Sequence, residues 1–94
     1  MAEYMVRVEL FKAEGEEYKD LHEKMQALGL NRTVNFEDGS VRKLPIGTYF
    51  GPSNLGIHDL RDKVRAIATP LSSPAGPSIL VSQSQTWSAF LPKA

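Results

Sequence analysis

Segments of two periodicities alternate along the chain, and their order predicts the fold class. Stretches in which apolar and polar residues alternate with period 2 predict strands, and two stretches with helical apolar spacing predict amphipathic helices. Their order is strand, helix, strand, strand, helix, strand. In 94 residues this order predicts a single α+β domain, 1–94, with 88–94 as a tail. The predicted architecture is a ferredoxin-like βαββαβ two-layer sandwich, with a four-stranded antiparallel sheet and two helices on one face.

The first strand and the first helix have the clearest patterns. Within 3–12, one face of the predicted strand is apolar and consists of Tyr4, Val6, Val8 and Leu10. The other face, with Arg7 and Glu9, is expected to lie open. Within 15–29, a stripe at i, i+3, i+7 and i+10 consists of Tyr18, Leu21, Met25 and Leu28. Gly29 is expected to end this helix because glycine adopts the left-handed conformation at little cost.

The middle of the chain predicts a hairpin and a third strand. Asp38-Gly39, between 31–36 and 41–50, is a strong turn signal because such turns need positive φ. Pro45 has no N–H to donate, so together with Gly47 it predicts a bulge or bend. Pairing is then expected mainly over Thr48–Phe50. In this layout the first and third strands lie at the centre of the sheet.

The second helix is predicted to start after residues 51–54, with Ser53 or Asn54 as its N-cap, and to end at Pro70. Its apolar stripe consists of Ile57, Leu60, Val64 and Ile67. A loop over 70–78 precedes the last strand, 79–87. Three apolar residues near the end, Trp87, Phe90 and Leu91, either close the core or add to the sheet edge of a partner.

Composition excludes several classes of site. The chain has 11 basic and 11 acidic residues, so no net charge attracts it to nucleic acid or to membranes, and it has no cysteine. Neither a signal peptide nor an apolar run long enough to insert in a membrane is present, so we expect a cytoplasmic protein. Glu16-Glu17 and Glu37-Asp38 are interpreted as helix-start and turn chemistry. We therefore expect no metal site and no cofactor.

His22 and His58 are the only histidines and hence the natural candidates for a catalytic base near neutral pH. His22 flanks the stripe of the first helix, and His58 lies in the first turn of the second. The alternative is that both are ordinary residues on helix surfaces. No nucleophile or carboxylate in a recognisable motif accompanies either one.

A basic surface and one aromatic residue are the candidates for nucleic-acid binding. Arg61 and Arg65 share a helix side with His58, and with Arg42 and Lys43 they would contact phosphates. The alternative is a solvated helix face with local ion pairs. Tyr49, on the predicted third strand, would contact a base, as aromatics do in ferredoxin-like RNA-binding domains, or would pack in the core or in a dimer.

The chain resembles the GhoS-type antitoxins of type V toxin–antitoxin systems. The resemblance rests on Tyr4-Met5-Val6, the run Gly39-x-x-Arg42-x-Leu44, Tyr49 and Asp59-Leu60, and it extends without a gap over about residues 18–66. It implies a ferredoxin-like fold akin to small CRISPR-associated endoribonucleases, a homodimer, and cleavage of single-stranded RNA, the toxin's message. Arg42 matches a family arginine. In the first helix, where the family has basic residues, this chain has Asp20 and His22.

Two hypotheses follow for the function. The first is a GhoS-like RNA-binding protein that acts on single-stranded RNA as an endoribonuclease, with arginines holding phosphates and a histidine moving the proton. The second is a non-enzymatic dimeric module that binds a protein or nucleic acid through the open sheet face or the C-terminal tail. A small-ligand sensor is a third option, which the short chain and the absence of a pocket motif disfavour.

Overall fold

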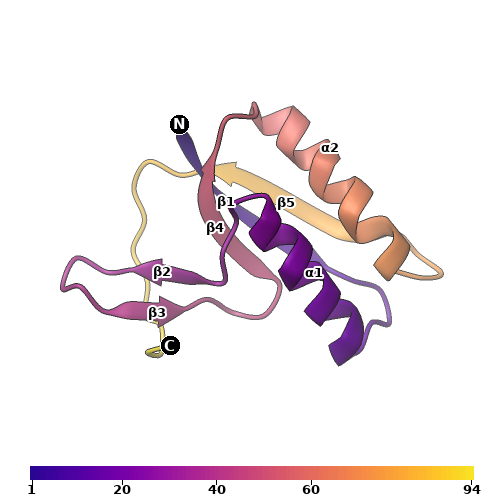
Figure 1. Ribbon diagram of the computed structural model, residues 1–94, viewed down its shortest axis with the longest axis horizontal. Coiled ribbons are helices and arrows are strands. Elements are labelled where there is room, and N and C mark those ends of the chain that lie inside the picture. The colour runs from indigo at the N-terminus through magenta and orange to yellow at the C-terminus, as the bar shows by residue number, and fades with distance from the viewer.

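The protein is described by a computed structural model that covers all residues, 1–94, and contains two antiparallel sheets and two α-helices (Figure 1). The larger sheet has the order β4-β1-β5, and its strands are β1 (Ala2–Glu9), β4 (Thr48–Ser53) and β5 (Ser78–Gln83). The smaller sheet is a hairpin of β2 (Thr33–Asn35) and β3 (Val41–Lys43). The helices are α1 (Gly15–Ala27) and α2 (Ile57–Ala68), and a 3-10 turn, η1 (Thr69–Leu71), follows α2. Neither α-helix is both long and apolar enough to traverse a bilayer.

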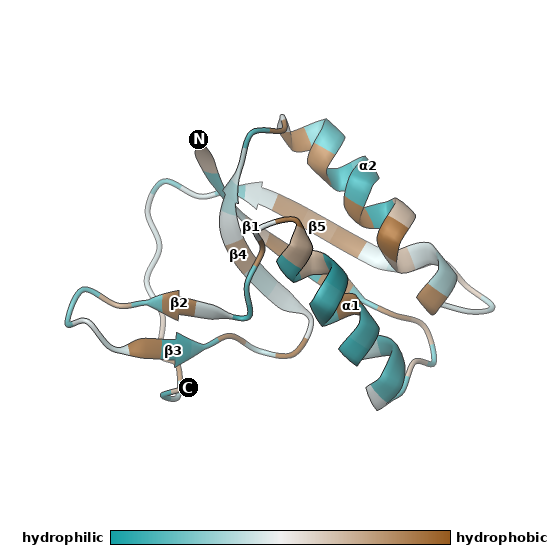
Figure 2. Cartoon of the chain, in the orientation of Figure 1, coloured by the Kyte–Doolittle hydropathy of each residue, from teal (hydrophilic) through white to brown (hydrophobic).

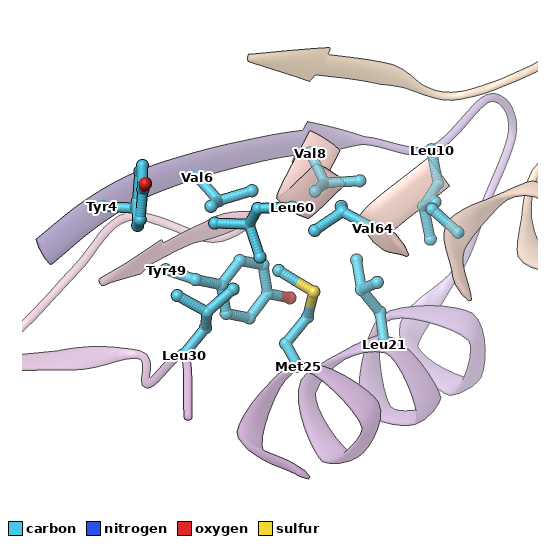
Figure 3. Packing of buried hydrophobic residues seen from close by; sticks show 11 residues of the cluster. Tyr4, Val6, Val8, Leu10, Leu21, Met25, Leu30, Tyr49, Leu60 and Val64 are labelled. Atoms are coloured by element: carbon cyan, nitrogen blue, oxygen red, sulfur yellow. The ribbon is translucent and has the colours of Figure 1, made fainter. Parts of the chain in front are cut away.

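The main core lies between one face of the larger sheet and the two helices (Figure 3). The alternating apolar residues predicted for the first strand are all buried there, together with Leu21 and Met25 of α1 and Leu60 and Val64 of α2. Figure 2 shows that the outward side of α1 is mostly hydrophilic. Two short helices on one face of a twisted sheet therefore bury most of the large apolar side chains.

The ends of α1 follow from its local sequence, as predicted. The Glu14 backbone N–H donates a hydrogen bond to Glu17 Oε2 at 3.1 Å, and this forms half of a capping box. Gly29 follows the helix with φ of +87°, the conformation that glycine adopts most readily. Glu17 thus serves the helix start, as its position in the sequence indicates.

A single four-stranded sheet is not formed, because the chain before β2 makes only one bridge to β4 and β2 itself pairs with β3. The only pairing of this segment with β4 is an isolated bridge between Asn31 and Phe50. The chain between β3 and β4 turns at Pro45, whose carbonyl accepts the Thr48 N–H at 3.0 Å, and at Gly47, with φ of +81°. This bend, predicted from proline and glycine, aims the hairpin away from the larger sheet. β1 is central as expected, whereas β4 is an edge of the three-stranded sheet.

Two boundary predictions were wrong. The N-cap of α2 is Gly56, and Ser53 instead closes a turn before the helix, where its Oγ accepts the Leu55 N–H at 3.1 Å. The last strand ends at Gln83 and does not continue to residue 87. Polar side chains occupy most positions from 82 to 88, so no apolar face holds this segment in the sheet.

The segment 84–94 folds back across the second face of the larger sheet. Pro92 O accepts the Lys43 N–H and Val41 O accepts the Ala94 N–H, both at 3.0 Å, so the end of the chain lies along β3. A second apolar cluster forms beneath it from Val34, Leu44 and Phe50, with Met5, Phe36, Trp87 and Leu91 packed against it. Of the terminal apolar residues, Trp87 and Leu91 close this cluster, and Phe90 is fully exposed.

Candidate functional site

His22 is held at the surface of α1 by a buried tyrosine. Its Nδ1 lies 2.6 Å from the hydroxyl of Tyr49, and the two ring centroids are 5.6 Å apart. Tyr49 is completely buried, and this burial raises its pKa to about 12. The pKa of His22 is lowered, first by partial burial and then by the positive charge of Arg32. Below its ordinary value of 6.5, this pKa leaves His22 mostly neutral at pH 7.

The hydrogen bond between these residues fixes which ring nitrogen faces outward. The phenol keeps its proton at neutral pH and has no other partner than His22. We infer that Tyr49 donates to Nδ1, because the opposite arrangement would leave a buried hydroxyl proton without an acceptor. The neutral imidazole then carries its proton on Nε2, which has no partner within the protein. His22 therefore offers an N–H donor to solvent.

A shallow pocket of about 320 Å³ lies beside His22, between α1 and the start of β2. Lys19 and Arg32 supply positive charge at its rim, and Glu23 is the one acidic residue. Gln26, Asn31 and Thr33 complete the polar lining. The pocket thus combines two cations, one neutral imidazole N–H and neutral hydrogen-bonding groups, which suits a phosphodiester or another anion.

His58, Arg61 and Arg65 lie on the exposed side of α2, as predicted. Arg61 Nη1 lies 3.4 Å from His58 Nδ1, and its other nitrogens pair with Asp62 at 2.9 and 3.0 Å. Such an exposed pair is the solvated-face arrangement that the sequence left open. No partner of His58 orients it as Tyr49 orients His22.

Arg42 and Lys43 lie on β3, at the opposite end of the molecule from α2 (Figure 1). The Arg42 guanidinium donates to Ser40 Oγ at 2.9 Å and to Leu91 O at 2.8 Å, and its Cζ lies 4.6 Å from the centroid of the Phe36 ring. Arg42 therefore joins the hairpin to the C-terminal segment, while Lys43 is exposed. The four predicted cations do not form one surface.

The prediction that Tyr49 contacts a base does not fit its position. In β4, Thr48 and Phe50 face the side of Arg7 and Met5, whereas Tyr49 faces the helices. Its ring is buried in the main core among residues of β1 and α1 (Figure 3). The alternative prediction, that Tyr49 packs in the core, agrees with its position. Tyr49 influences the surface only through its contact with His22.

Sequence reasoning missed Lys19 and Arg32 as partners of His22. Lys19 is three positions before His22, which puts the two on the same side of α1. Arg32 lies a few residues after the end of α1, where the chain turns back, and it lines the same pocket as His22. Only the fold reveals this placement. A lone arginine in a connecting segment carries no signal of this kind.

The comparisons with known proteins add no family assignment: no protein-family model and no curated protein matches the chain. The similarity to GhoS-type antitoxins stays a prediction.

Proposed function

We propose that this protein binds single-stranded RNA and that the pocket beside His22 receives a phosphate of the RNA backbone. The arrangement that supports this proposal best is the contact between Tyr49 and His22, from which we infer a free Nε2–H, together with Lys19 and Arg32 in the lining of the same pocket. Phosphate oxygens accept hydrogen bonds from such donors, and an arginine beside the site adds charge and a second donor.

The support for RNA as the ligand comes from the charges at the pocket and not from the net charge of the chain. The chain is neutral overall, so binding would depend on a few well-placed contacts. Two cations at one pocket provide such contacts, and Asn31 and Thr33 offer polar groups to a ribose or base edge. The affinity expected from so few phosphate contacts is modest and strongly salt-dependent.

Fluorescence anisotropy of a labelled single-stranded RNA of mixed sequence would test the proposal. Arg32→Gln is expected to weaken binding about 3- to 10-fold and to lower the slope of log K against log salt by about 0.7, the loss of one phosphate contact on a single strand. Arg61→Gln, which removes the same charge from α2, is the matched control and should change neither quantity. Equal effects of the two variants would refute a phosphate site beside His22.

Cleavage of the RNA is the second part of the proposal and demands more of His22. A base that takes the 2′-OH proton needs a free lone pair on Nε2, so the imidazole would have to carry its proton on Nδ1. Tyr49→Phe removes the hydroxyl that disfavours this tautomer. If His22 is the base, Tyr49→Phe cleaves labelled RNA at least as fast as the unaltered chain, and His22→Gln abolishes cleavage. Intact RNA at high protein concentration, with and without divalent metal, would exclude the nuclease function and leave RNA binding.

We further propose that the fold is a ferredoxin-like sandwich whose outer strand has detached, and that the protein is a GhoS-like antitoxin. The strand order β5-β1-β4, with the Asn31–Phe50 bridge beyond β4, supports the first point. It is the ferredoxin-like strand order in which the outer strand beside β4 is reduced to a single bridge. A homodimer and a cytoplasmic location belong to the same proposal. Sedimentation at micromolar concentration tests the dimer, and rescue of cells that express a small membrane toxin tests the antitoxin role.

A further inference from the structure

The second face of the larger sheet contains a partly open apolar pocket, distinct from the surface beside His22. The pocket has a volume of about 270 Å³ and lies between the sheet and the folded-back segment 84–94. Met5, Phe50, Leu80 and Trp87 are four of its eight hydrophobic lining residues. A volume slightly below the usual range of about 300–1,000 Å³ fits a small molecule rather than a peptide.

Thr48 lines this pocket and carries a hydroxyl that is unpaired and closed off from solvent. The residue is only 6% exposed, and its Oγ1 is the one buried side-chain oxygen or nitrogen for which the protein supplies no hydrogen-bond partner. Register places Thr48 opposite Arg7 on the same face of the sheet, and both line the pocket. Buried polar groups are nearly always paired, so an unpaired one beside a cavity calls for a partner that the protein itself does not supply.

Arg7 supplies a charge at the same place. It is exposed, forms no ion pair or side-chain hydrogen bond, and stands opposite Leu80, which is 66% exposed although it is a large apolar residue within a strand. The other charged side chains of this face on β1 are Glu3 and Glu9, which are exposed and form no ion pair with Arg7. A guanidinium with no protein partner, beside an uncovered leucine, suits a ligand with an acidic head and an apolar body.

We propose that this pocket binds a small monocarboxylic acid with an apolar tail. The carboxylate pairs with the Arg7 guanidinium and accepts a hydrogen bond from Thr48 Oγ1 after the threonine side chain has turned toward the cavity. The tail lies among Phe50, Leu80 and Trp87, where it covers the exposed leucine. This site is independent of the proposed RNA binding, because it uses the opposite face of the sheet.

The chain offers its own probe, because Trp87 is the only tryptophan and lines the pocket. Titration with hexanoate, followed by tryptophan fluorescence, is expected to give a saturable change and to raise the melting temperature. Hexan-1-ol, which has the same tail without the charge, is expected to bind about 10-fold more weakly. Arg7→Gln should remove this difference and leave hexan-1-ol unaffected. Arg61→Gln, with the same change of charge on α2, should leave both affinities as they were.

Thr48→Val tests the hydroxyl without changing the shape of the pocket. It is expected to weaken hexanoate about 5-fold while the melting temperature of the free protein stays the same or rises, because an unpaired buried hydroxyl has been removed. No saturable response to hexanoate, or equal affinity for hexanoate and hexan-1-ol in the unaltered chain, would overturn the proposal. A change of Trp87 emission with protein concentration in the absence of hexanoate would also overturn it if the change parallels dimer formation. A second copy of the chain would then cover the pocket.

Discussion

Arg42 provides the sharpest test of how this chain uses its basic residues. Its sequence position and the family resemblance predict a phosphate contact, whereas the structure uses its guanidinium to join the hairpin to the C-terminal segment. The perturbation is Arg42→Gln, with Arg42→Lys as its partner. Lysine keeps the positive charge but not the planar fork that reaches Ser40 and Leu91 together.

The expected loss of stability follows from the contacts of Arg42. Its side chain is 21% exposed, and hydrogen bonds from a charged donor contribute about 1.5–3 kcal/mol when buried, so the Ser40 and Leu91 contacts are expected to contribute about 2 kcal/mol together. The Phe36 contact adds about 0.5 kcal/mol. The ion pair with Asp38, at 3.8 Å on a carboxylate that is 63% exposed, adds close to nothing. A loss of about 2–3 kcal/mol lowers the melting temperature of a domain of this size by roughly 8–24 °C.

Thermal unfolding and Trp87 emission together measure this effect. Both variants should melt about equally early, with emission shifted to longer wavelength as the C-terminal segment loosens over the second cluster. Lys43→Gln, at the neighbouring exposed position, is the control and should stay within about 0.5 kcal/mol of the unaltered chain. If Arg42→Gln melts normally but loses RNA binding, and Arg42→Lys retains it, then Arg42 binds phosphate and does not hold the C-terminal segment in place.

Three further predictions concern the main sheet and α1. Gly51→Ala should destabilise the fold by more than about 2 kcal/mol in urea unfolding, because its Cβ would clash with the carbonyl oxygen of Gly29, whereas an added Cβ at Gly76 meets nothing. Equal stability of the two alanine variants would contradict this packing. Leu21→Ala should cost about 2–5 kcal/mol in the same assay, since the side chain is completely buried, and a loss below 1 kcal/mol would show that the core is misplaced. The free energy of unfolding should fall as the pH drops below 6.5 towards the lowered pKa of His22, because the unfolded chain then binds more protons than the folded one. His22→Gln should remove this part of the pH dependence. A pH dependence that stays unchanged in the variant would assign it to other groups.

The sequence was sufficient for the elements that depend on local pattern. The burial of Tyr4, Val6 and Val8 follows from strict alternation, and the end of α1 follows from Gly29. The break between β3 and β4 was also predictable, because proline and glycine act on their own backbone. The effect of this break on the sheet was not predictable from the sequence. Loss of the fourth strand depends on the direction of the whole β2-β3 hairpin relative to the larger sheet.

The site was harder to predict because it depends on which of two adjacent aromatic residues faces the helices. Tyr49 and Phe50 point to opposite faces of β4, and the sequence of this short strand does not distinguish them. Register with β1 decides the matter: Phe50 stands opposite Met5, on the face away from the helices, and Tyr49 stands opposite the buried Val6. From this choice it follows that a tyrosine hydroxyl lies beneath α1 and can hold His22.

The same register divides the chemistry of the molecule between the two faces of one sheet. On the helix side, Tyr49 fixes a neutral histidine beside two cations, an arrangement suited to a phosphate. On the other side, Thr48, one residue earlier, lines an apolar pocket with Arg7 at its rim. Because adjacent residues of β4 serve the two sites, a shift of this strand by one residue would exchange their side chains between the faces and abolish both. The tight Gly51–Gly29 approach, which anchors β4 against the end of α1, therefore matters for both proposed sites as well as for stability.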